Sequence, residues 1–353
     1  MNRRKTVATV LFAILILILV ALIAIWTHFG QREKRYECTN YAMGTYIQQT
    51  VYGKKAQEAA KEAAAKIQEL EDLISWRKND SDIGRLNQAA GTKPAVIHEK
   101  TAALLRTSLE IAQKSDGAYD PTILPISDLW GFESDNPCVP DSKDIQKFLP
   151  DVNYKDLQVS TGSSGSTALL KRAMMGIDLG GIGKGAACDE AVAAYRSAGA
   201  ECGIISAGGS SLGLFGTKAD GTPWKIAIRD PNSSDNSVTE MAELNLDSGF
   251  VSTSGVYEKK FTQNGITYHH LLNPKTGYPE NNGLVSVTVV TPNGALSDGL
   301  STACFVLGLE KGEALLKQYQ CEGVFIDRAR NVYVTAGLKS RLKIINSKYI
   351  VNS

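Results

Sequence analysis

Two stretches in the first third of the chain carry apolar residues at helical spacing. In 54–74 the apolar residues stand at 59, 63, 67, 70 and 74, and in 99–114 they include Leu104, Leu105, Leu109 and Ile111. Residues three and four apart lie on one face of an α-helix, so both stretches are expected to form amphipathic helices. A third stretch, 296–319, has the same period, with interruptions at Gly308 and Gly312.

Shorter segments alternate between apolar and polar residues or are rich in β-branched residues, which predicts strands. The segment 41–52 alternates, and 284–291 is rich in valine, as expected of a buried strand. Asn264-Gly265 is a strong hairpin signal. The other predicted strands lie at 173–177, 202–209, 212–216, 224–229, 243–250, 256–261, 266–272, 323–327 and 332–336.

The N-terminus differs from the rest of the chain. The stretch 7–26 has no charged side chain and is almost entirely aliphatic, and Arg3, Arg4 and Lys5 precede it. About 20 apolar residues can cross a bilayer as a helix, and basic flanking residues stay in the cytoplasm. We therefore expect 1–30 to be a single-pass membrane anchor that leaves the bulk of the chain outside the cytoplasm. A cleaved signal segment and a buried core helix are the alternatives.

Composition narrows the classes of partner. The net charge is +1, which gives no indication of a nucleic-acid surface. Six cysteines are scattered without a C-x-x-C pair, so neither a disulfide framework nor a zinc site is indicated. A single disulfide remains compatible with an extracytoplasmic compartment.

A glycine-rich stretch follows the predicted strand 173–177 and precedes a run of helix formers at 190–196. It reads Asp178-Leu-Gly-Gly-Ile-Gly-Lys-Gly185. Its glycines let backbone N–H groups approach a ligand closely, and a helix N-terminus adds positive potential. The stretch therefore predicts a phosphate site, with a tight strand–helix connection as the alternative. It does not match the P-loop pattern, because Ala186 follows Gly185, and it does not match G-x-G-x-x-G either.

A carboxylate and a hydroxyl stand four residues apart in Asp298-Gly-Leu-Ser-Thr302. If a helix begins here, Asp298 and Thr302 share one face. Such a pair suits a hard cation that also binds phosphate oxygens. The alternative is an N-terminal helix cap formed by Ser297 or Asp298.

Two adjacent histidines end the predicted strand 266–272. Neighbouring side chains on a strand point to opposite faces, so only one of His269 and His270 can face a cleft. Such a histidine can act as a general base toward a hydroxyl nucleophile. A strand histidine that only bonds to the backbone is the alternative.

Seven motifs follow one another along the chain. They are Met43-Gly-Thr45, Gly117-Ala-Tyr-Asp-Pro121 with Asp128-Leu-Trp-Gly-Phe132, Asp178-Leu-Gly-Gly-Ile-Gly-Lys-Gly185, Ser206-Ala-Gly-Gly209, Ser252-Thr-Ser-Gly255, His270-Leu-Leu-Asn-Pro-Lys-Thr-Gly277 and Asp298-Gly-Leu-Ser-Thr302. In this order they resemble the ApbE family, the FAD:protein FMN transferases, over about 39–337. The resemblance implies an α+β fold, ApbE-like and T-fold-related, with one catalytic domain of mixed sheets and helices.

The resemblance also implies a reaction. Members bind FAD and Mg²⁺ and move FMN onto a Ser or Thr hydroxyl of an acceptor protein as a phosphoester, releasing AMP. Some members instead hydrolyse FAD, so an FAD pyrophosphatase that yields FMN and AMP is one alternative. A flavin-binding protein without turnover is another. The expected acceptors are secreted or membrane-bound electron-transfer proteins.

By motif position, the resemblance implies three sets of site residues. Mg²⁺ would be held by the carbonyl of Gly183 and the side chains of Asp298 and Thr302. Asp298 and His270 would be the catalytic residues, and His270 matches the family histidine that takes part in the transfer reaction. FAD would be held by Met43, Trp76, Ala118, Tyr119, Asp120, Gly180, Ala186 and Leu272.

The chain departs from the family pattern at three positions. Asn273 and Ser210 stand where the family often has Asp, and Gly183 replaces a frequent Ala. The first two bear on details of flavin or acceptor contact, while the third leaves a carbonyl ligand unchanged. The expected organisation is an anchor or signal segment at 1–30, a linker at 31–38, the flavin transferase domain at 39–340 and a C-terminal tail at 341–353.

Overall fold

The computed structural model describes residues 35–163, 165–218, 220–233 and 237–352. The anchor or signal segment expected at 1–30 lies outside these residues. Within the described ranges, no helix combines the length and the apolar character needed to cross a bilayer.

A central sheet organises the part of the chain that the structure describes, and it has nine strands there. Neighbouring strands pair antiparallel, except that β15 and β17 run parallel. In spatial order the strands are β1 (Arg35–Ala42), β2 (Thr45–Tyr52), β6 (Cys202–Ala207), β7 (Ser211–Phe215), β10 (Gly249–Gly255), β13 (Leu284–Thr291), β14 (Glu322–Asp327), β15 (Asn331–Val334) and β17 (Ile350–Asn352).

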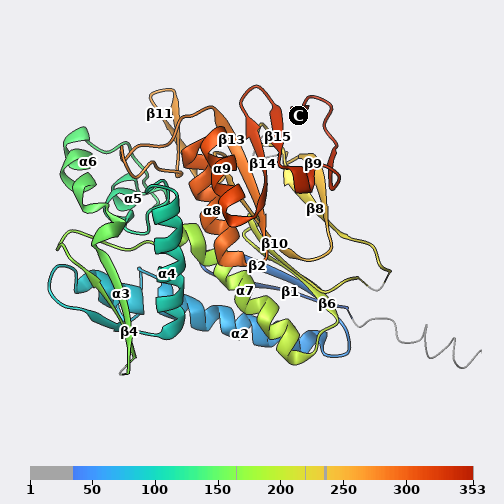
Figure 1. Ribbon diagram of the computed structural model, residues 1–353, viewed down its shortest axis with the longest axis horizontal. Helices are drawn as coiled ribbons and strands as arrows, with labels where there is room; N and C mark the ends of the chain where they lie inside the picture. The colour runs from blue at the N-terminus through green and yellow to red at the C-terminus, as the bar shows by residue number, and fades with distance from the viewer. Residues whose placement is uncertain (1–34, 164, 219, 234–236, 353) are drawn as a thin grey trace, which may run out of the picture.

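Helices cover one face of this sheet (Figure 1). They are α2 (Ala56–Ile74), α7 (Gly180–Ala198), α8 (Gly294–Leu307) and α9 (Leu309–Tyr319). The apolar stripe expected along 54–74 is buried at all five of its positions, which confirms the helical period. The main hydrophobic core lies between these helices and the sheet.

A smaller sheet covers the opposite face. Its order is β16 (Leu342–Ile344), β9 (Glu240–Leu246) and β8 (Trp224–Arg229), and a second core fills the space between the two sheets. The described part of the expected C-terminal tail is built into both sheets, since β16 belongs to the smaller sheet and β17 to the central sheet. Tyr349 is buried there and donates its hydroxyl to Asp230.

A helical subdomain gathers beside the central sheet, at the left of Figure 1. It contains α3 (Asp82–Gln88), α4 (Glu99–Lys114), α5 (Leu124–Trp130), α6 (Ser142–Phe148), the short 3₁₀ turns η1 (Leu149–Asp151) and η2 (Tyr154–Asp156), and a sheet of β3 (Ala95–Ile97), β5 (Gly165–Leu170) and β4 (Leu157–Gly162). A third 3₁₀ turn, η3 (Ala336–Leu338), follows β15.

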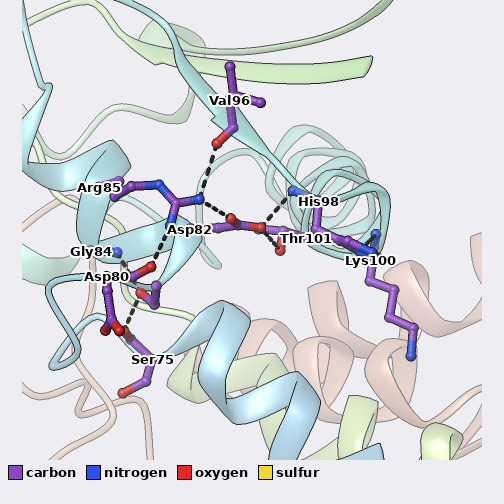
Figure 2. A network of polar contacts seen from close by, with 10 residues as sticks. Ser75, Asp80, Asp82, Gly84, Arg85, Val96, His98, Lys100 and Thr101 are labelled. Atoms are coloured by element: carbon purple, nitrogen blue, oxygen red, sulfur yellow. Dashed lines mark hydrogen bonds and ion pairs between the residues drawn. The ribbon is translucent and has the colours of Figure 1, made fainter. Parts of the chain in front are cut away.

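Figure 2 shows how a buried carboxylate joins α3 to α4. Asp82 Oδ2 accepts from the His98 N–H at 2.7 Å and from Thr101 Oγ1 at 2.6 Å, while Oδ1 pairs with Arg85. His98 in turn caps α4, since its Nδ1 accepts from the Lys100 N–H at 3.1 Å. Because these polar groups satisfy one another, the network fixes the subdomain.

A separate hairpin packs against α5. It consists of β11 (Lys260–Gln263) and β12 (Ile266–His269), joined by the turn expected at Asn264-Gly265. The Trp130 ring lies against Phe132, Phe261 and Tyr268, with ring centroids 5.4–6.3 Å apart. This packing sets where the chain enters and leaves the hairpin.

Several predicted elements are wrong. Residues 173–177 form only an isolated bridge, Gly176 to Ile123, rather than a strand. The segment 256–261 extends only from Lys260 onward, and the strands β4 and β5 were not predicted. Gly312 lies inside α9, so the helical stretch breaks at Gly308 alone, where φ is +80°. Whether a segment forms a strand depends on pairing with distant segments, and the apolar content of the segment alone does not predict that pairing.

Candidate functional site

The glycine-rich stretch forms the start of α7 rather than a loop. The helix begins at Gly180, and Asp178 stands just before it, accepting from the Gly180 N–H at 2.8 Å and from Ser127 Oγ at 3.2 Å. Burial raises the pKa of the Asp178 carboxyl, and the Gly180 N–H opposes that effect. The expectation of a glycine-rich turn between a strand and a helix is therefore wrong, because the four glycines lie inside α7 and the preceding strand is absent.

Two glycines bring α7 and α8 into backbone contact. A β-carbon placed on Gly185 would lie 2.0 Å from the Gly294 carbonyl oxygen, and one placed on Gly294 would lie 2.2 Å from the Gly185 carbonyl oxygen. No side chain fits at either position. This approach sets the face of α8 that carries Asp298 against the first turns of α7.

Asp298 is buried, with 5% of its surface exposed, and both oxygens have partners. Oδ2 accepts from the Gly185 N–H at 2.9 Å, and Oδ1 accepts from Ser211 Oγ at 2.8 Å. The carboxylate therefore joins α7, α8 and β7. Each oxygen has further lone pairs, so the hydrogen bonds orient the group without using its full acceptor capacity.

Thr302 lies one turn further along α8. Its Oγ1 is 3.3 Å from Ser254 Oγ and 3.6 Å from a β-carbon placed on Gly181. The helix expected at Asp298-Gly-Leu-Ser-Thr302 is thus confirmed, and both side chains face α7. The cap alternative is wrong, because α8 begins at Gly294 and its cap is Asn293.

These donors suit a hard cation. A carboxylate and a hydroxyl beside helix backbone are oxygen ligands of the kind that Mg²⁺ accepts. Among the residues described, His, Cys, Asp and Glu side chains form no group of three or more that could hold a metal. The predicted ligand set contains one carboxylate and neither of the His and Cys side chains that zinc sites mostly use. Gly183 lies on the same helix start, and its carbonyl remains a predicted ligand.

Two residues of the expected flavin set lie against the start of α7. Met43 forms the β1–β2 turn with φ +56°, and its Cε lies 3.2 Å from a β-carbon placed on Gly183. Tyr119 is buried, and its ring lies 3.2 Å from a β-carbon placed on Gly181. The structure therefore brings together the glycines, Met43, Tyr119, Asp298 and Thr302.

The other members of the flavin set have different surroundings. The Asp120 carboxylate is hydrogen-bonded within the protein. It accepts from Thr122 Oγ1 at 2.6 Å, from the Thr122 N–H at 2.8 Å and from the Tyr154 N–H at 2.9 Å. Burial raises the pKa of Asp120. Ala118 and Ala186 are buried, Gly180 is exposed and Trp76 packs at the edge of the main core. Leu272 packs in a separate cluster with Ile126, Trp130 and Ile145.

The two histidines have different surroundings, although β12 ends at His269 and His270 lies just beyond the strand. His269 is buried; its Nε2 lies 3.0 Å from the Glu280 carbonyl, and its Nδ1 accepts from the Leu271 N–H at 3.3 Å. Both nitrogens are therefore used by the fold. Burial lowers the pKa of His269 to about 4.

His270 is half-buried, and its Nε2 makes no hydrogen bond within the described part of the chain. Its backbone N–H donates to the Lys259 carbonyl at 3.0 Å, and its ring Nδ1 lies 3.3 Å from the same oxygen. Burial lowers the pKa of His270 to about 3, with further contributions from the charges of Lys259 and Lys184 and from His269. The imidazole is neutral at physiological pH, and a proton on Nδ1 leaves Nε2 as an acceptor.

The sequence did not indicate the residues that orient the two candidate metal ligands, Asp298 and Thr302. Ser211 holds Asp298, and Ser254 lies against Thr302 and 2.8 Å from Ser301 Oγ. Ser254 belongs to a motif that the sequence singled out, but Ser211 follows its motif by two residues. Only the pairing of β7 with β10 brings both hydroxyls to one place.

One departure from the family pattern has a local explanation. The Asn273 amide donates to Glu280 Oε2 at 2.7 Å, and its Oδ1 accepts from the Lys275 N–H at 2.8 Å. An Asp at this position would place two carboxylates together, so Asn273 is matched to Glu280.

Comparisons with known proteins agree with this arrangement. The ApbE family model matches residues 43–325. The FAD:protein FMN transferase of Treponema pallidum (strain Nichols) is 30% identical over 91% of this chain and 92% of its own. The FAD:protein FMN transferase of Escherichia coli (strain K12) is 31% identical over 78% of this chain and 79% of its own.

Solved structures have the same fold. The ApbE protein from Thermotoga maritima superposes with a TM-score of 0.78 at 28% identity, covering 87% of this chain and 99% of its own. The flavin transferase ApbE from Vibrio cholerae also gives 0.78, at 26% identity, covering 88% and 99%. These neighbours confirm the mixed α+β fold expected from the sequence.

Proposed function

The chain belongs to the ApbE family, and from that premise we propose that it is an FAD:protein FMN transferase that depends on Mg²⁺ and releases AMP. The observation that carries the proposal is the contact between the glycine-rich start of α7 and the Asp298 face of α8. It brings the Asp298 carboxylate close to the first turns of a helix, and a helix N-terminus is an environment that suits a pyrophosphate.

The proposed reaction exchanges the phosphoanhydride bond of FAD for a phosphoester bond to the acceptor. The acceptor hydroxyl oxygen bonds to the FMN phosphorus, and the bond between that phosphorus and the AMP oxygen breaks. The hydroxyl proton passes to His270 Nε2, and AMP leaves with the electron pair of the broken bond. A base so placed contributes about 10²–10⁴-fold to the rate.

The residues of this chain have distinct parts in the proposal. Asp298, Thr302 and the Gly183 carbonyl would hold Mg²⁺, which when bound would neutralise pyrophosphate charge. Ser211 and the Gly185 N–H keep the Asp298 carboxylate in one orientation. Met43 and Tyr119, which lie against the same helix start, would contact FAD, together with Trp76 and the remaining members of the predicted set.

The test is a transfer assay with purified chain, FAD, Mg²⁺ and a peptide that carries a Thr. The peptide should become heavier by one FMN, with an equal amount of AMP. AMP and free FMN without labelled peptide would indicate an FAD pyrophosphatase instead. Bound FAD without AMP would indicate a flavin-binding protein and would overturn the proposal.

We also propose that residues 1–30 anchor the enzyme in the cell membrane and that the catalytic domain faces outward, toward secreted or membrane-bound electron-transfer acceptors. The support is the uncharged stretch 7–26 behind Arg3, Arg4 and Lys5. The full chain should remain in the membrane fraction after a carbonate wash. Its recovery in the soluble fraction with residues 1–30 intact would contradict the anchor.

A further inference from the structure

Three charged side chains from separate segments meet beside the proposed site. Arg77 follows α2, Glu133 follows α5, and Lys259 precedes β11. The Arg77 guanidinium lies 2.7 Å from Glu133 Oε2, and the Lys259 ammonium pairs with Glu133 Oε1. One carboxylate thus joins two cations, one on each oxygen.

Each end of this ion network is attached to a residue of the proposed site. The Arg77 guanidinium stacks on the adjacent Trp76 ring, 4.1 Å from its centroid. At the other end, the Lys259 carbonyl accepts from the His270 N–H at 3.0 Å and lies 3.3 Å from His270 Nδ1. Glu133 therefore stands between a predicted flavin contact and the proposed base.

The aromatic packing holds Glu133 in place. Phe132, its neighbour in the chain, stacks on Trp130 with centroids 5.6 Å apart and lies 5.4 Å from Phe261 of the hairpin. Trp130 is fully buried and donates its Nε1–H to the Gly277 carbonyl at 2.8 Å. The segment that carries Glu133 is thus fixed against the hairpin that begins after Lys259, so the ion pair orders few additional groups.

The ion network contributes little to the folding stability of the protein. The side chains of Arg77, Glu133 and Lys259 are 50%, 46% and 47% exposed, and exposed ion pairs contribute only about 0–1 kcal/mol. Partial burial raises the pKa of Glu133, but Lys259 and Arg77 outweigh it and lower the pKa to about 2. The carboxylate is therefore charged wherever the enzyme works, and both cations keep their partner.

We propose that Glu133 is a positioning residue, which holds Trp76 and His270 at a fixed separation through Arg77 and Lys259. This inference rests on the proposed transfer of FMN. An error of about 1 Å between a bound substrate and a catalytic group can cost about 10²-fold in rate. Loss of the network should therefore lower kcat more than it weakens FAD binding.

The test compares Glu133→Gln with the wild type, with Asp247→Asn as the matched control. Asp247 follows β9 and forms an exposed pair at 3.4 Å with Arg341, which precedes β16, so this pair belongs to the smaller sheet. Glu133→Gln should lower kcat for peptide labelling by about tenfold or more, while the FAD dissociation constant stays within about threefold. Asp247→Asn should leave both unchanged.

A second pair of variants guards against a simple folding defect. Lys259→Arg keeps the charge and can still reach Glu133, so it should retain most of the rate, whereas Lys259→Met should behave like Glu133→Gln. If kcat for Glu133→Gln stays within twofold of the wild type, or if Lys259→Arg and Lys259→Met behave alike, the inference is wrong. A wild type that labels no peptide would instead refute the proposed function.

Discussion

The Asp298 carboxylate connects two helices and a strand before any ligand binds. Its partners are the Gly185 N–H and the Ser211 hydroxyl, and it is almost fully buried. Truncation to alanine would leave both partners unsatisfied, at about 1–3 kcal/mol each, and would confuse stability with chemistry. The informative substitution is therefore the isosteric amide.

Asp298→Asn should fold and lose Mg²⁺-dependent AMP release by about 10²-fold or more, since metal charge stabilisation amounts to several kcal/mol. AMP release is measured against Mg²⁺ concentration, with the thermal midpoint recorded beside it. Asp141→Asn is the control, because Asp141 caps α6 and asparagine caps equally well. Full Mg²⁺-dependent turnover in Asp298→Asn would remove Asp298 from the metal site.

His270 gives a second prediction, on pH dependence. Its pKa of about 3 means that the free enzyme keeps a neutral imidazole far below the ordinary value of 6.5. The charged and titratable neighbours that lower this pKa are Lys259, Lys184 and His269. We expect kcat/KM to stay level from pH 8 to pH 5, where an unperturbed histidine base would lose about thirtyfold. A break near pH 6.5 that His270→Asn removes would contradict this environment.

His269 affects stability instead of turnover. Its folded pKa of about 4 lies below the unfolded value, so the unfolded chain binds the proton more readily between these values. Stability is therefore complete above about pH 6.5 and falls as the pH drops toward 4, by up to about 3 kcal/mol from this residue. Urea unfolding at pH 7 and pH 5 should show a smaller pH effect in His269→Gln than in the wild type. An unchanged pH effect would rule out His269 as the cause.

At the scale of elements, the α7–α8 contact sets the proposed site. Both helices were predictable, because helix formers follow the glycine-rich stretch and 296–319 has helical periodicity. Their crossing at Gly185 and Gly294 was not, because glycines mark either a turn or a close approach and the sequence does not distinguish them. The apolar content of 173–177 indicated a strand that does not form, and no local pattern indicated the approach of Ser211 to Asp298.

Gly185→Ala tests this contact. Inside a helix, Gly→Ala usually stabilises by about 1 kcal/mol, but here the new methyl would lie 2.0 Å from the Gly294 oxygen and 2.9 Å from Asp298 Cβ. We expect the free energy of unfolding to fall by about 2 kcal/mol and Mg²⁺-dependent turnover to fall with it. In Gly162→Ala the methyl meets no atom within 4 Å, so this control should change neither. A stabilised, active Gly185→Ala would show that the helices do not need this approach.

At the scale of the whole molecule, helices cover one face of a long antiparallel sheet and a smaller sheet covers the other. The helices that cover the first face were predictable from the sequence, because 3.6-residue periodicity is a local property. The second core was not, since it depends on β8, β9 and β16 meeting the far face of the central sheet. The resemblance identified Asp298, Thr302 and the glycines as neighbours, whereas the ion network of Arg77, Glu133 and Lys259 depends on long-range packing.

As an FAD:protein FMN transferase, this chain should transfer FMN from FAD to a hydroxyl of another protein. The most direct measurement is mass spectrometry of a Thr-containing acceptor peptide after incubation with the chain, FAD and Mg²⁺, with AMP quantified in the same sample. We expect one FMN added per peptide and AMP in equal amount, both lost in Asp298→Asn. Unmodified peptide in the presence of bound FAD, with or without AMP, would contradict it.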